Sequence, residues 1–300
     1  MSAVDPARTS ILQSHLLGMP QLAYGGLSEA WLLRQLGDMH WSLIGRYLEL
    51  EPQAICDTFG NRLYPAFVAI RLRNCAFGAA REGDSLEIAS AGEFVSRKRF
   101  YSRHVGMIRG KAVLQVELLS IFLKRQRESD NSGLVSAEPT SMRHAVIVRS
   151  PPQGAETLLE AARAARQGAN SMTRLATPAP VRFLPCPSIE FNGAKILYFA
   201  YIPSIMDRAE NAWLFDCHLS LGNIVGRDLF ILSNANVGDV LTVEASVFDI
   251  SARGDCVARV MNEMTGNVVA VGIAQREAPA ALAAATGSST RRILEVAASR

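Results

Sequence analysis

Tyr64 is the first residue of this chain whose type and position suggest chemistry. It begins a predicted strand directly before Pro65, in the segment Asn61-Arg-Leu-Tyr-Pro-Ala-Phe67. A phenol is neutral near pH 7 and can donate a hydrogen bond to a carbonyl or enolate oxygen, whereas nucleophilic attack requires a lowered pKa or a nearby base. A core tyrosine at a strand edge has the same sequence context. The residue types alone leave both interpretations open.

Two further candidates precede Tyr64. Gly25 and Gly26 come just before a predicted helix, where unpaired N–H groups can hold negative charge developing on a thioester oxygen. The same glycines are also ordinary turn residues. His40, late on that helix beside Trp41, is either a proton donor and substrate anchor or a packed core residue.

A basic cluster, Arg97-Lys98-Arg99 with Arg103, is the fourth candidate. It suits either the solvated face of a strand or a site for an anionic ligand, such as a phosphate, or for an acidic carrier protein, since charge steers encounter. The formal net charge of +3 is too small to indicate nucleic-acid binding.

Composition limits the class of protein. The chain of 300 residues is 49% hydrophobic and 20% charged, which supplies a sizeable core, and it contains no uncharged apolar run of the ~18 to 20 residues that cross a membrane. The first residues lack the pattern of a secretory signal, so we expect a cytoplasmic protein. The 5 cysteines are scattered without a C-x-x-C pair, so no metal site is expected.

The elements that position these residues follow from the apolar pattern. Apolar residues at spacings of three and four lie around most of the segment 27–50, which predicts a long helix wrapped by other structure. Segments rich in Val, Ile, Phe and Tyr predict strands. They are 64–77, 86–94, 98–109 and 111–124 in the first half, and 195–202, 215–221, 228–233, 240–248, 256–264 and 267–275 in the second. Residues 155–168 have helical composition, and a shorter helix is expected from residue 203.

The two halves repeat one pattern. Gly83, Asp84 and Val113 return as Gly238, Asp239 and Val268 at a single offset, which indicates an internal duplication. A helix followed by antiparallel strands, twice, is an α+β arrangement that resembles a double hot dog, in which each sheet wraps a helix. The predicted division is a first unit at 11–130, a crossover with a helix at 131–180, a second unit at 181–277 and a weakly ordered tail at 278–300.

Beyond the pattern, the chain resembles a small family of double hot dog biosynthetic proteins that includes the bifunctional acyltransferase/decarboxylase of the leinamycin polyketide pathway. The resemblance runs from about residue 11 to residue 277 and is most specific in the first helix. It rests on Gly18-Met-Pro20, Gly26-Leu-Ser-Glu29, Trp31-Leu-Leu33, Gly37-Asp38, His40-Trp41, Arg62-Leu-Tyr64 with Phe67, and Leu197-Tyr-Phe-Ala200 followed by Asp207 and Glu210.

The resemblance implies that methylmalonyl-CoA or malonyl-CoA is decarboxylated and that the acyl group passes to the phosphopantetheine arm of an acyl carrier protein. It implies Tyr64 as the active-site residue and no cofactor beyond the two thioester carriers. The expected partners are acyl-CoA and a carrier protein, with neither nucleic acid nor membrane, and edge strands leave a homodimer possible. Two alternatives stay open: a hot dog thioesterase or dehydratase using Glu29, and a non-catalytic protein that binds an acyl chain or carrier.

Overall fold

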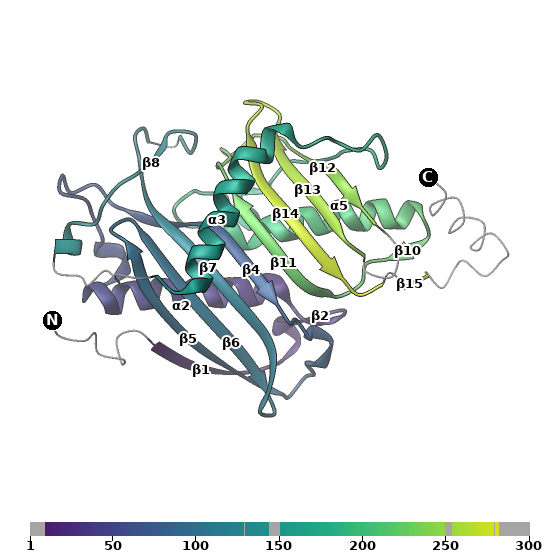
Figure 1. Ribbon diagram of the computed structural model, residues 1–300, viewed down its shortest axis with the longest axis horizontal. Helices are drawn as coiled ribbons and strands as arrows, with labels where there is room; N and C mark the ends of the chain where they lie inside the picture. The colour runs from purple at the N-terminus through teal and green to yellow at the C-terminus, as the bar shows by residue number, and fades with distance from the viewer. Residues whose placement is uncertain (1–9, 129, 144–150, 250–253, 279, 282–300) are drawn as a thin grey trace.

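In the part of the chain that the structure describes, one antiparallel sheet of eleven strands extends through both halves, with helices on both of its faces (Figure 1). The computed structural model describes residues 10–128, 130–143, 151–249, 254–278 and 280–281. Helices α2 (Glu29–Leu48) and α5 (Ile202–Asp216) lie on one face of the sheet, and α3 (Gln153–Gly168) crosses the opposite face. The three layers confirm the α+β class.

The strand order reads the same from both ends, which confirms the double hot dog. It is β1-β5-β6-β7-β4-β11-β14-β13-β12-β9, with β8 beside β7. The first-half strands are β1 (Ser10–Leu16), β4 (Tyr64–Arg73), β5 (Ser85–Ser96), β6 (Arg99–Ile108), β7 (Lys111–Arg125) and β8 (Leu134–Ser136). Those of the second half are β9 (Val181–Phe183), β11 (Ile224–Ile231), β12 (Leu241–Phe248), β13 (Cys256–Asn262) and β14 (Val268–Arg276).

The duplicated turns have one backbone requirement. Gly83 (φ 84°) precedes β5 and Gly238 (φ 95°) precedes β12, and both conformations lie in the left-handed region that favours glycine. The aspartate after each glycine accepts hydrogen bonds within its turn, Asp84 from the Arg81 backbone and Asp239 from the Asn236 backbone. The repeat seen in the sequence is therefore a repeat of turn geometry as well as of strands.

Helix α2 begins and ends as its sequence directs. The side chain of Ser28 accepts a hydrogen bond from the Trp31 backbone at the N-cap, Glu29 complements the helix dipole in the first turn, and Glu49 ends the helix in a left-handed conformation. Buried residues occupy most of its circumference, because the first half of the sheet curls around it. The predicted span of 27–50 is two residues too long at each end.

Helix α5 is the counterpart of α2 in the second half, and here two strand predictions are wrong. Residues 195–202 form a loop and a 3-10 turn, η6 (Phe199–Tyr201), that leads into α5, and α5 continues to Asp216, so the segment 215–221 holds only the two-residue strand β10. The apolar side chains of both segments pack against the helices and the core instead of pairing in the sheet. Phe199 and Leu197, for example, are both buried.

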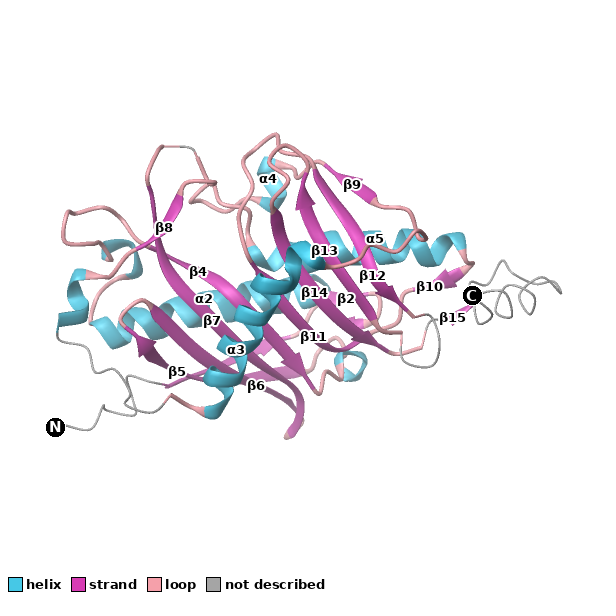
Figure 2. Cartoon of the chain, turned by 45° about the horizontal axis from the view of Figure 1, so that its top comes forward, coloured by secondary structure: helices cyan, strands magenta, loops and turns pink. Residues whose placement is uncertain are grey.

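Helix α3 fulfils the prediction for residues 155–168. It packs Ala155 and Leu158 against Ala69, Leu119 and Phe230 of the three central strands β4, β7 and β11. Figure 2 shows it lying across the sheet on the side away from α2 and α5. The centre of the sheet is therefore covered on both faces.

Short elements complete the fold. The edge strands β1 and β9 were missed from sequence, and of the predicted tail 278–300 only Ala278 and β15 fall within the described residues. The short elements are η1 (Met19–Gln21), β2 (Leu22–Ala23), β3 (Gly26–Leu27), η2 (Pro52–Ala54), η3 (Phe77–Ala79), η4 (Thr140–Arg143), η5 (Ala169–Ser171), α4 (Pro187–Glu190), β10 (Leu219–Ser220) and β15 (Ala280–Ala281).

Candidate active site

The sheet opens where its two halves meet. Strands β4 and β11 pair only through residues 69–72 and 227–230, so the first five residues of β4 have no partner on the β11 side. A cavity of about 920 Å³ occupies this opening. Its walls come from both halves and from both faces of the sheet: Gly37 and Trp41 of α2, Tyr64 of β4, Phe199 before α5 and Leu159 of α3.

Tyr64 lines this cavity. It pairs with Leu123 of β7, three residues before Phe67, whose ring lies 4.8 Å from that of His40 and 4.0 Å from that of Phe199 on the α2 side. Because successive strand residues point to opposite faces, Tyr64 lies on the α3 face. Two guanidinium groups lie over its ring, Arg62 at 5.1 Å and Arg125 at 5.9 Å from the centroid. Their positive charge stabilises negative charge at or near the phenol.

Asn131 holds Arg125 in this position. The Oδ1 of Asn131 accepts a hydrogen bond from Arg125 Nη2 at 2.8 Å. Its Nδ2 donates to the carbonyls of Lys195 at 2.7 Å and Ala235 at 2.9 Å, and its backbone N–H donates to Asn236 Oδ1 at 2.8 Å. One buried amide therefore ties the end of β7 to two second-half loops that form the cavity wall.

The second half supplies the opposite wall through Tyr198 and Phe199. A side chain on Gly37 would meet the Phe199 ring at 2.8 Å, so the absence of a Cβ lets α2 approach the start of α5 closely. Burial raises the pKa of Tyr198 to about 12, and the nearby Asp38 carboxylate adds to the effect. Asp38 itself is exposed on the cavity wall and is the carboxylate that α2 contributes to the site.

Gly25 and Gly26 lie elsewhere. They belong to the β2–β3 hairpin and do not line the cavity, which α2 reaches only from Gly37 onward. Gly26 has a φ of 120°, and a Cβ on it would collide with the Phe77 carbonyl, while a Cβ on Gly25 would collide with the Asn223 side chain. Close packing accounts for both glycines, and the structure does not bring them to Tyr64.

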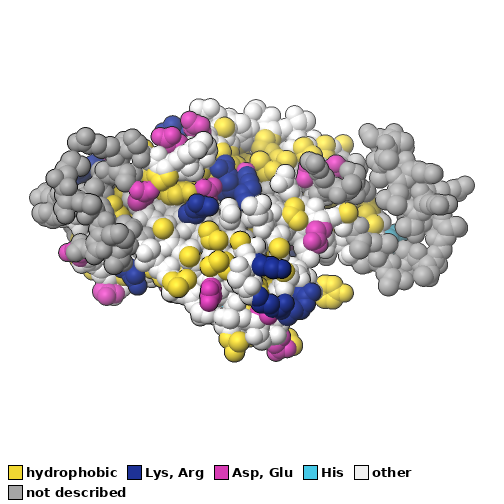
Figure 3. All heavy atoms as spheres, turned by 60° about the horizontal axis from the view of Figure 1, so that its bottom comes forward, with side chains coloured by type: hydrophobic (Ala, Val, Ile, Leu, Met, Phe, Trp, Pro, Cys, Tyr) yellow, Lys and Arg dark blue, Asp and Glu magenta, His cyan; other side chains and the backbone are white. Residues whose placement is uncertain are grey.

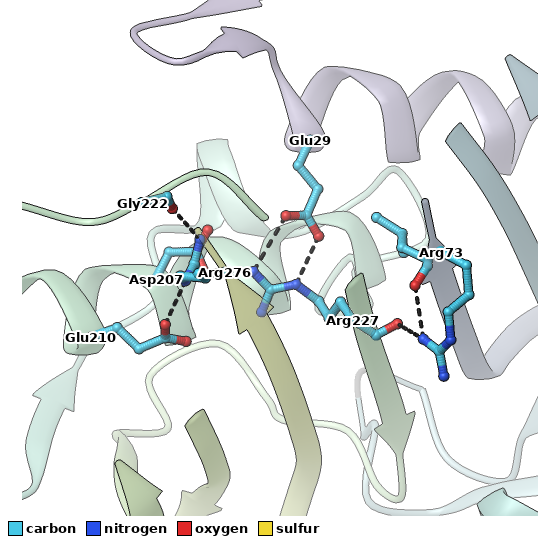
Figure 4. A network of polar contacts seen from close by, with 8 residues as sticks. Glu29, Arg73, Asp207, Glu210, Gly222, Arg227 and Arg276 are labelled. Carbon is cyan, nitrogen blue, oxygen red and sulfur yellow. Dashed lines mark hydrogen bonds and ion pairs between the residues drawn. The ribbon is translucent and has the colours of Figure 1, made fainter. Parts of the chain in front are cut away.

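A buried ion network occupies the start of α2 (Figure 4). Arg227, whose side chain is 1% exposed, lies 2.9 Å from Glu29 and 2.7 Å from Asp207. Arg276 pairs with Asp207 and, at 2.7 Å, with Glu210. Burial raises the pKa of Glu29 against the opposing effect of Arg227, and the two arginines lower the pKa of Asp207 although burial alone would raise it. Glu29 is thus engaged by an arginine.

His40 is fully buried and lies outside the cavity lining. Its Nδ1 is hydrogen-bonded with Ser102 at 2.6 Å and its Nε2 with Ser120 at 2.8 Å. Ser102 continues to His104 Nε2 at 2.7 Å, and His104 Nδ1 continues to Ser90 at 2.6 Å. Both ring nitrogens are engaged inside the core, so His40 has none to offer a substrate. The predicted substrate contact is therefore wrong, and His40 is a packed core residue.

The basic cluster divides into separate environments. Arg97 pairs with Glu138 at 2.8 Å, and Arg103 faces a second cavity of about 610 Å³ beside Glu117. Arg99 alone of the four lines the Tyr64 cavity, and Lys98 does not. On the face drawn in Figure 3, Lys and Arg side chains gather in separate groups with acidic side chains beside them.

The site also contains residues that sequence reasoning missed. They are Asn131, Arg163 and Arg166. Nothing in the local sequence marks them, because they reach the cavity only through the folding of a loop and of α3 against distant parts of the chain.

Within the ranges described, no three His, Cys, Asp or Glu side chains gather as a metal site requires. No helix of the described part combines the length and apolar character needed to cross a membrane.

Comparison with known proteins identifies the fold. No protein-family model matches the chain, and no curated protein sequence matches it. Among solved structures, a protein assigned as an oleoyl thioesterase from Lactobacillus plantarum superposes with a TM-score of 0.63 at 10% identity, over 90% of this chain and 97% of that one.

Two acyl-ACP thioesterases superpose similarly. The enzyme from Bacteroides thetaiotaomicron gives a TM-score of 0.60 at 10% identity, over 91% of this chain and 100% of that one. The 12:0-ACP thioesterase from Umbellularia californica gives a TM-score of 0.60 at 10% identity, over 89% of this chain and 93% of that one. At this identity the comparison establishes one thing: the chain has the double hot dog fold of these thioesterases across nearly its whole length.

Proposed function

We propose that this protein is an acyl-thioester enzyme that decarboxylates a malonyl-type CoA and transfers the resulting acyl group to an acyl carrier protein. The observation that carries the proposal is the position of Tyr64, in a cavity between the two hot dog units and beneath the guanidinium groups of Arg62 and Arg125. The fold shared with acyl-ACP thioesterases supports a thioester as substrate.

The reaction needs a group that stabilises an enolate. When the bond between Cα and the carboxylate breaks, its electron pair moves onto the thioester oxygen and carbon dioxide leaves. The Tyr64 hydroxyl donates a hydrogen bond to that oxygen, and the two guanidinium groups favour the negative charge. The enolate carbon then takes a proton to give an acetyl or propionyl thioester.

Transfer follows in the same cavity. The thiol of a phosphopantetheine arm attacks the thioester carbonyl, its proton is released, and the CoA thiolate leaves. Tyr64 can stabilise the tetrahedral oxyanion through the same hydrogen bond. The sequence of steps uses no reagent besides the two thioester carriers and water.

Hydrolysis of an acyl thioester is the second candidate function, favoured by one observation. Asp38 places a carboxylate on the cavity wall, where it can activate water for attack on the carbonyl. Glu29, the acid proposed from sequence for this chemistry, is held by Arg227 away from the cavity. Asp38 therefore replaces Glu29 as the residue to test for hydrolysis.

The decisive experiment follows the mass of a phosphopantetheinylated carrier protein incubated with enzyme and malonyl-CoA or methylmalonyl-CoA. We expect an acetyl or propionyl adduct, reduced about 100-fold or more by Tyr64→Phe, in line with the loss of one oxyanion donor. Tyr24→Phe is the matched control, because Tyr24 is fully exposed and remote from the cavity lining.

Three other outcomes each overturn the proposal. Free acid released from acyl-CoA, lost in Asp38→Asn but retained in Tyr64→Phe, identifies a thioesterase. Full transfer by Tyr64→Phe refutes the assignment of Tyr64. Carrier binding without turnover of any acyl-CoA identifies a non-catalytic binding protein.

A further inference from the structure

A pair of arginines lies at the α3 side of the Tyr64 cavity. Arg99 begins β6, and Arg163 comes from α3 together with Leu159, Ala162 and Arg166, all of which line the cavity. Their spacing of three and four residues places these α3 side chains on one face of the helix. Arg166 donates to the Leu232 carbonyl at 3.1 Å, which anchors the helix over the end of β11.

Arg99 and Arg163 are two neighbouring positive charges without a carboxylate partner among the described residues. Across the part of the chain that the structure describes, neither forms an ion pair with a carboxylate. Burial lowers the pKa of Arg99, and repulsion from Arg163 lowers it further, so the two charges are close enough to oppose each other. An anion bound between them offsets this repulsion, because it attracts both guanidinium groups.

The sheet register connects this pair to Tyr64. Arg99 pairs with Ile121, and Ile121 pairs with Ala66, so the three residues form one row across β6, β7 and β4. Two strand spacings separate Arg99 from β4, roughly 10 Å, and Tyr64 lies one row further along the same face. Ile121, Ala66 and Leu159 give the path between them an apolar lining.

We propose that Arg99 and Arg163 bind the phosphate of a phosphopantetheine arm, which enters the cavity from the α3 face and extends between the separated strands to place its thioester at Tyr64. The chemistry fits, because guanidinium groups donate paired hydrogen bonds to phosphate oxygens. Coenzyme A and a carrier protein both present this phosphate. The inference rests on the proposed function, since it assigns the substrate arm of the same site.

A binding experiment without turnover tests the assignment. Calorimetric titration of the full-length protein compares 4′-phosphopantetheine with pantetheine, which lacks only the phosphate. We expect the phosphorylated compound to bind at least about tenfold more tightly, as one charge-assisted hydrogen bond suffices to give. Arg99→Ala and Arg163→Ala each remove most of this preference, whereas Arg174→Ala, at an exposed arginine outside the cavity lining, retains it.

A charge reversal makes the test independent of folding. Arg163 is exposed on a helix, so Arg163→Glu is expected to fold, to pair with Arg99 and to abolish the phosphate preference without lowering the melting temperature. Equal binding of the two compounds by the wild-type protein, or an intact preference in Arg163→Glu, would overturn the assignment.

Kinetic measurements show whether the bound phosphate belongs to CoA or to the carrier protein. They also test the phosphate site separately from the proposed reaction. A raised KM for acyl-CoA in Arg163→Ala identifies CoA as the occupant, and a raised KM for the carrier identifies its prosthetic group. A phosphate preference in a protein that does not decarboxylate malonyl thioesters refutes the reaction and leaves the phosphate site standing. Decarboxylation and transfer without the preference refute the phosphate site alone.

Discussion

The buried histidine pair predicts a specific loss of stability in mild acid. His40 and His104 are fully buried, and serine hydroxyls engage all four ring nitrogens. Burial lowers the pKa of His104 to about 3 and holds the pKa of His40 well below its usual value, with His104 as a second cause. Both rings therefore stay neutral in the folded protein while the unfolded chain takes up protons near pH 6.5.

The sign and the magnitude of this stability loss follow from the difference in proton binding between the folded and unfolded states. Because the folded-state pKa values lie below the unfolded value, the stabilisation is fully present above about pH 6.5 and is lost as the pH falls toward the folded values. Between pH 7 and pH 5 His104 accounts for about 2 kcal/mol of unfolding free energy, and His40, whose pKa is also lowered, contributes in the same direction. Glu29 and Glu93, whose pKa values burial raises, act in the opposite sense and reduce the total for the wild-type protein.

A comparison of variants isolates the histidine contribution. Urea unfolding followed by tryptophan fluorescence at pH 7, 6 and 5 gives the free energy of unfolding at each pH. His104→Gln, whose amide can bond both serines, should lose about 2 kcal/mol less than wild type between pH 7 and 5. His218→Asn replaces an exposed histidine and should follow the wild type. An identical pH dependence in His104→Gln and wild type would refute the reasoning.

Three further predictions concern the cavity and the ion network. Gly37→Ala adds a Cβ 2.8 Å from the Phe199 ring, and we expect a lower melting temperature, a loss of about 1–3 kcal/mol from overpacking, and slower turnover. Glu29→Gln removes a charge that faces Arg227, and chemical unfolding should show a loss of about 3 kcal/mol with transfer activity retained once the protein is folded. Asn131→Ala leaves buried partners unpaired, which should cost about 2–3 kcal/mol and raise the KM, whereas unchanged kinetics would contradict its role in shaping the wall.

The strands and the long helices could be predicted because their signals are local. Strands β5, β6 and β7 carry alternating or continuous apolar runs, Gly-containing turns precede β5 and follow β6, and α2 carries its own cap at Ser28. The segment 195–202 has the same β-branched and aromatic composition as a strand, yet its residues pack against α2 and β4. Composition alone cannot distinguish these outcomes, because the deciding contact, Phe199 on Phe67, spans more than a hundred residues.

The candidate site could be predicted only in part, for the same reason. Tyr64 was a candidate from its strand context, was chosen through the resemblance and lines the cavity, but many of the residues that line the cavity with it come from the second half and from α3. His40 had a plausible helical position, and only the structure shows that Ser102 and Ser120 engage it. A side chain's type indicates what it can do, whereas the long-range pairing of β4 with β11 decides what it faces.

The pseudo-twofold arrangement relates the two ends of the β4–β11 junction, but the two ends contain different residues. At each end of the β4–β11 junction, the start of one unit's helix meets the start of the other unit's central strand. Where Phe199 meets β4, aromatic side chains and Gly37 leave a cavity. Where Glu29 meets β11, the buried Arg227 contacts both Glu29 and Asp207, because a buried guanidinium requires nearby carboxylates.

Duplication within one chain is what permits this division. In a symmetric homodimer, a substitution that introduced an arginine at one end of the junction would introduce it at both, because the same residue occupies both positions. Once the units are fused, the two ends can differ, with a buried ion network at one and an open cavity at the other. The glycines before α2 are required for packing on the side of the ion network, through Phe77 and Asn223, and the chemistry we propose is confined to the cavity that contains Tyr64.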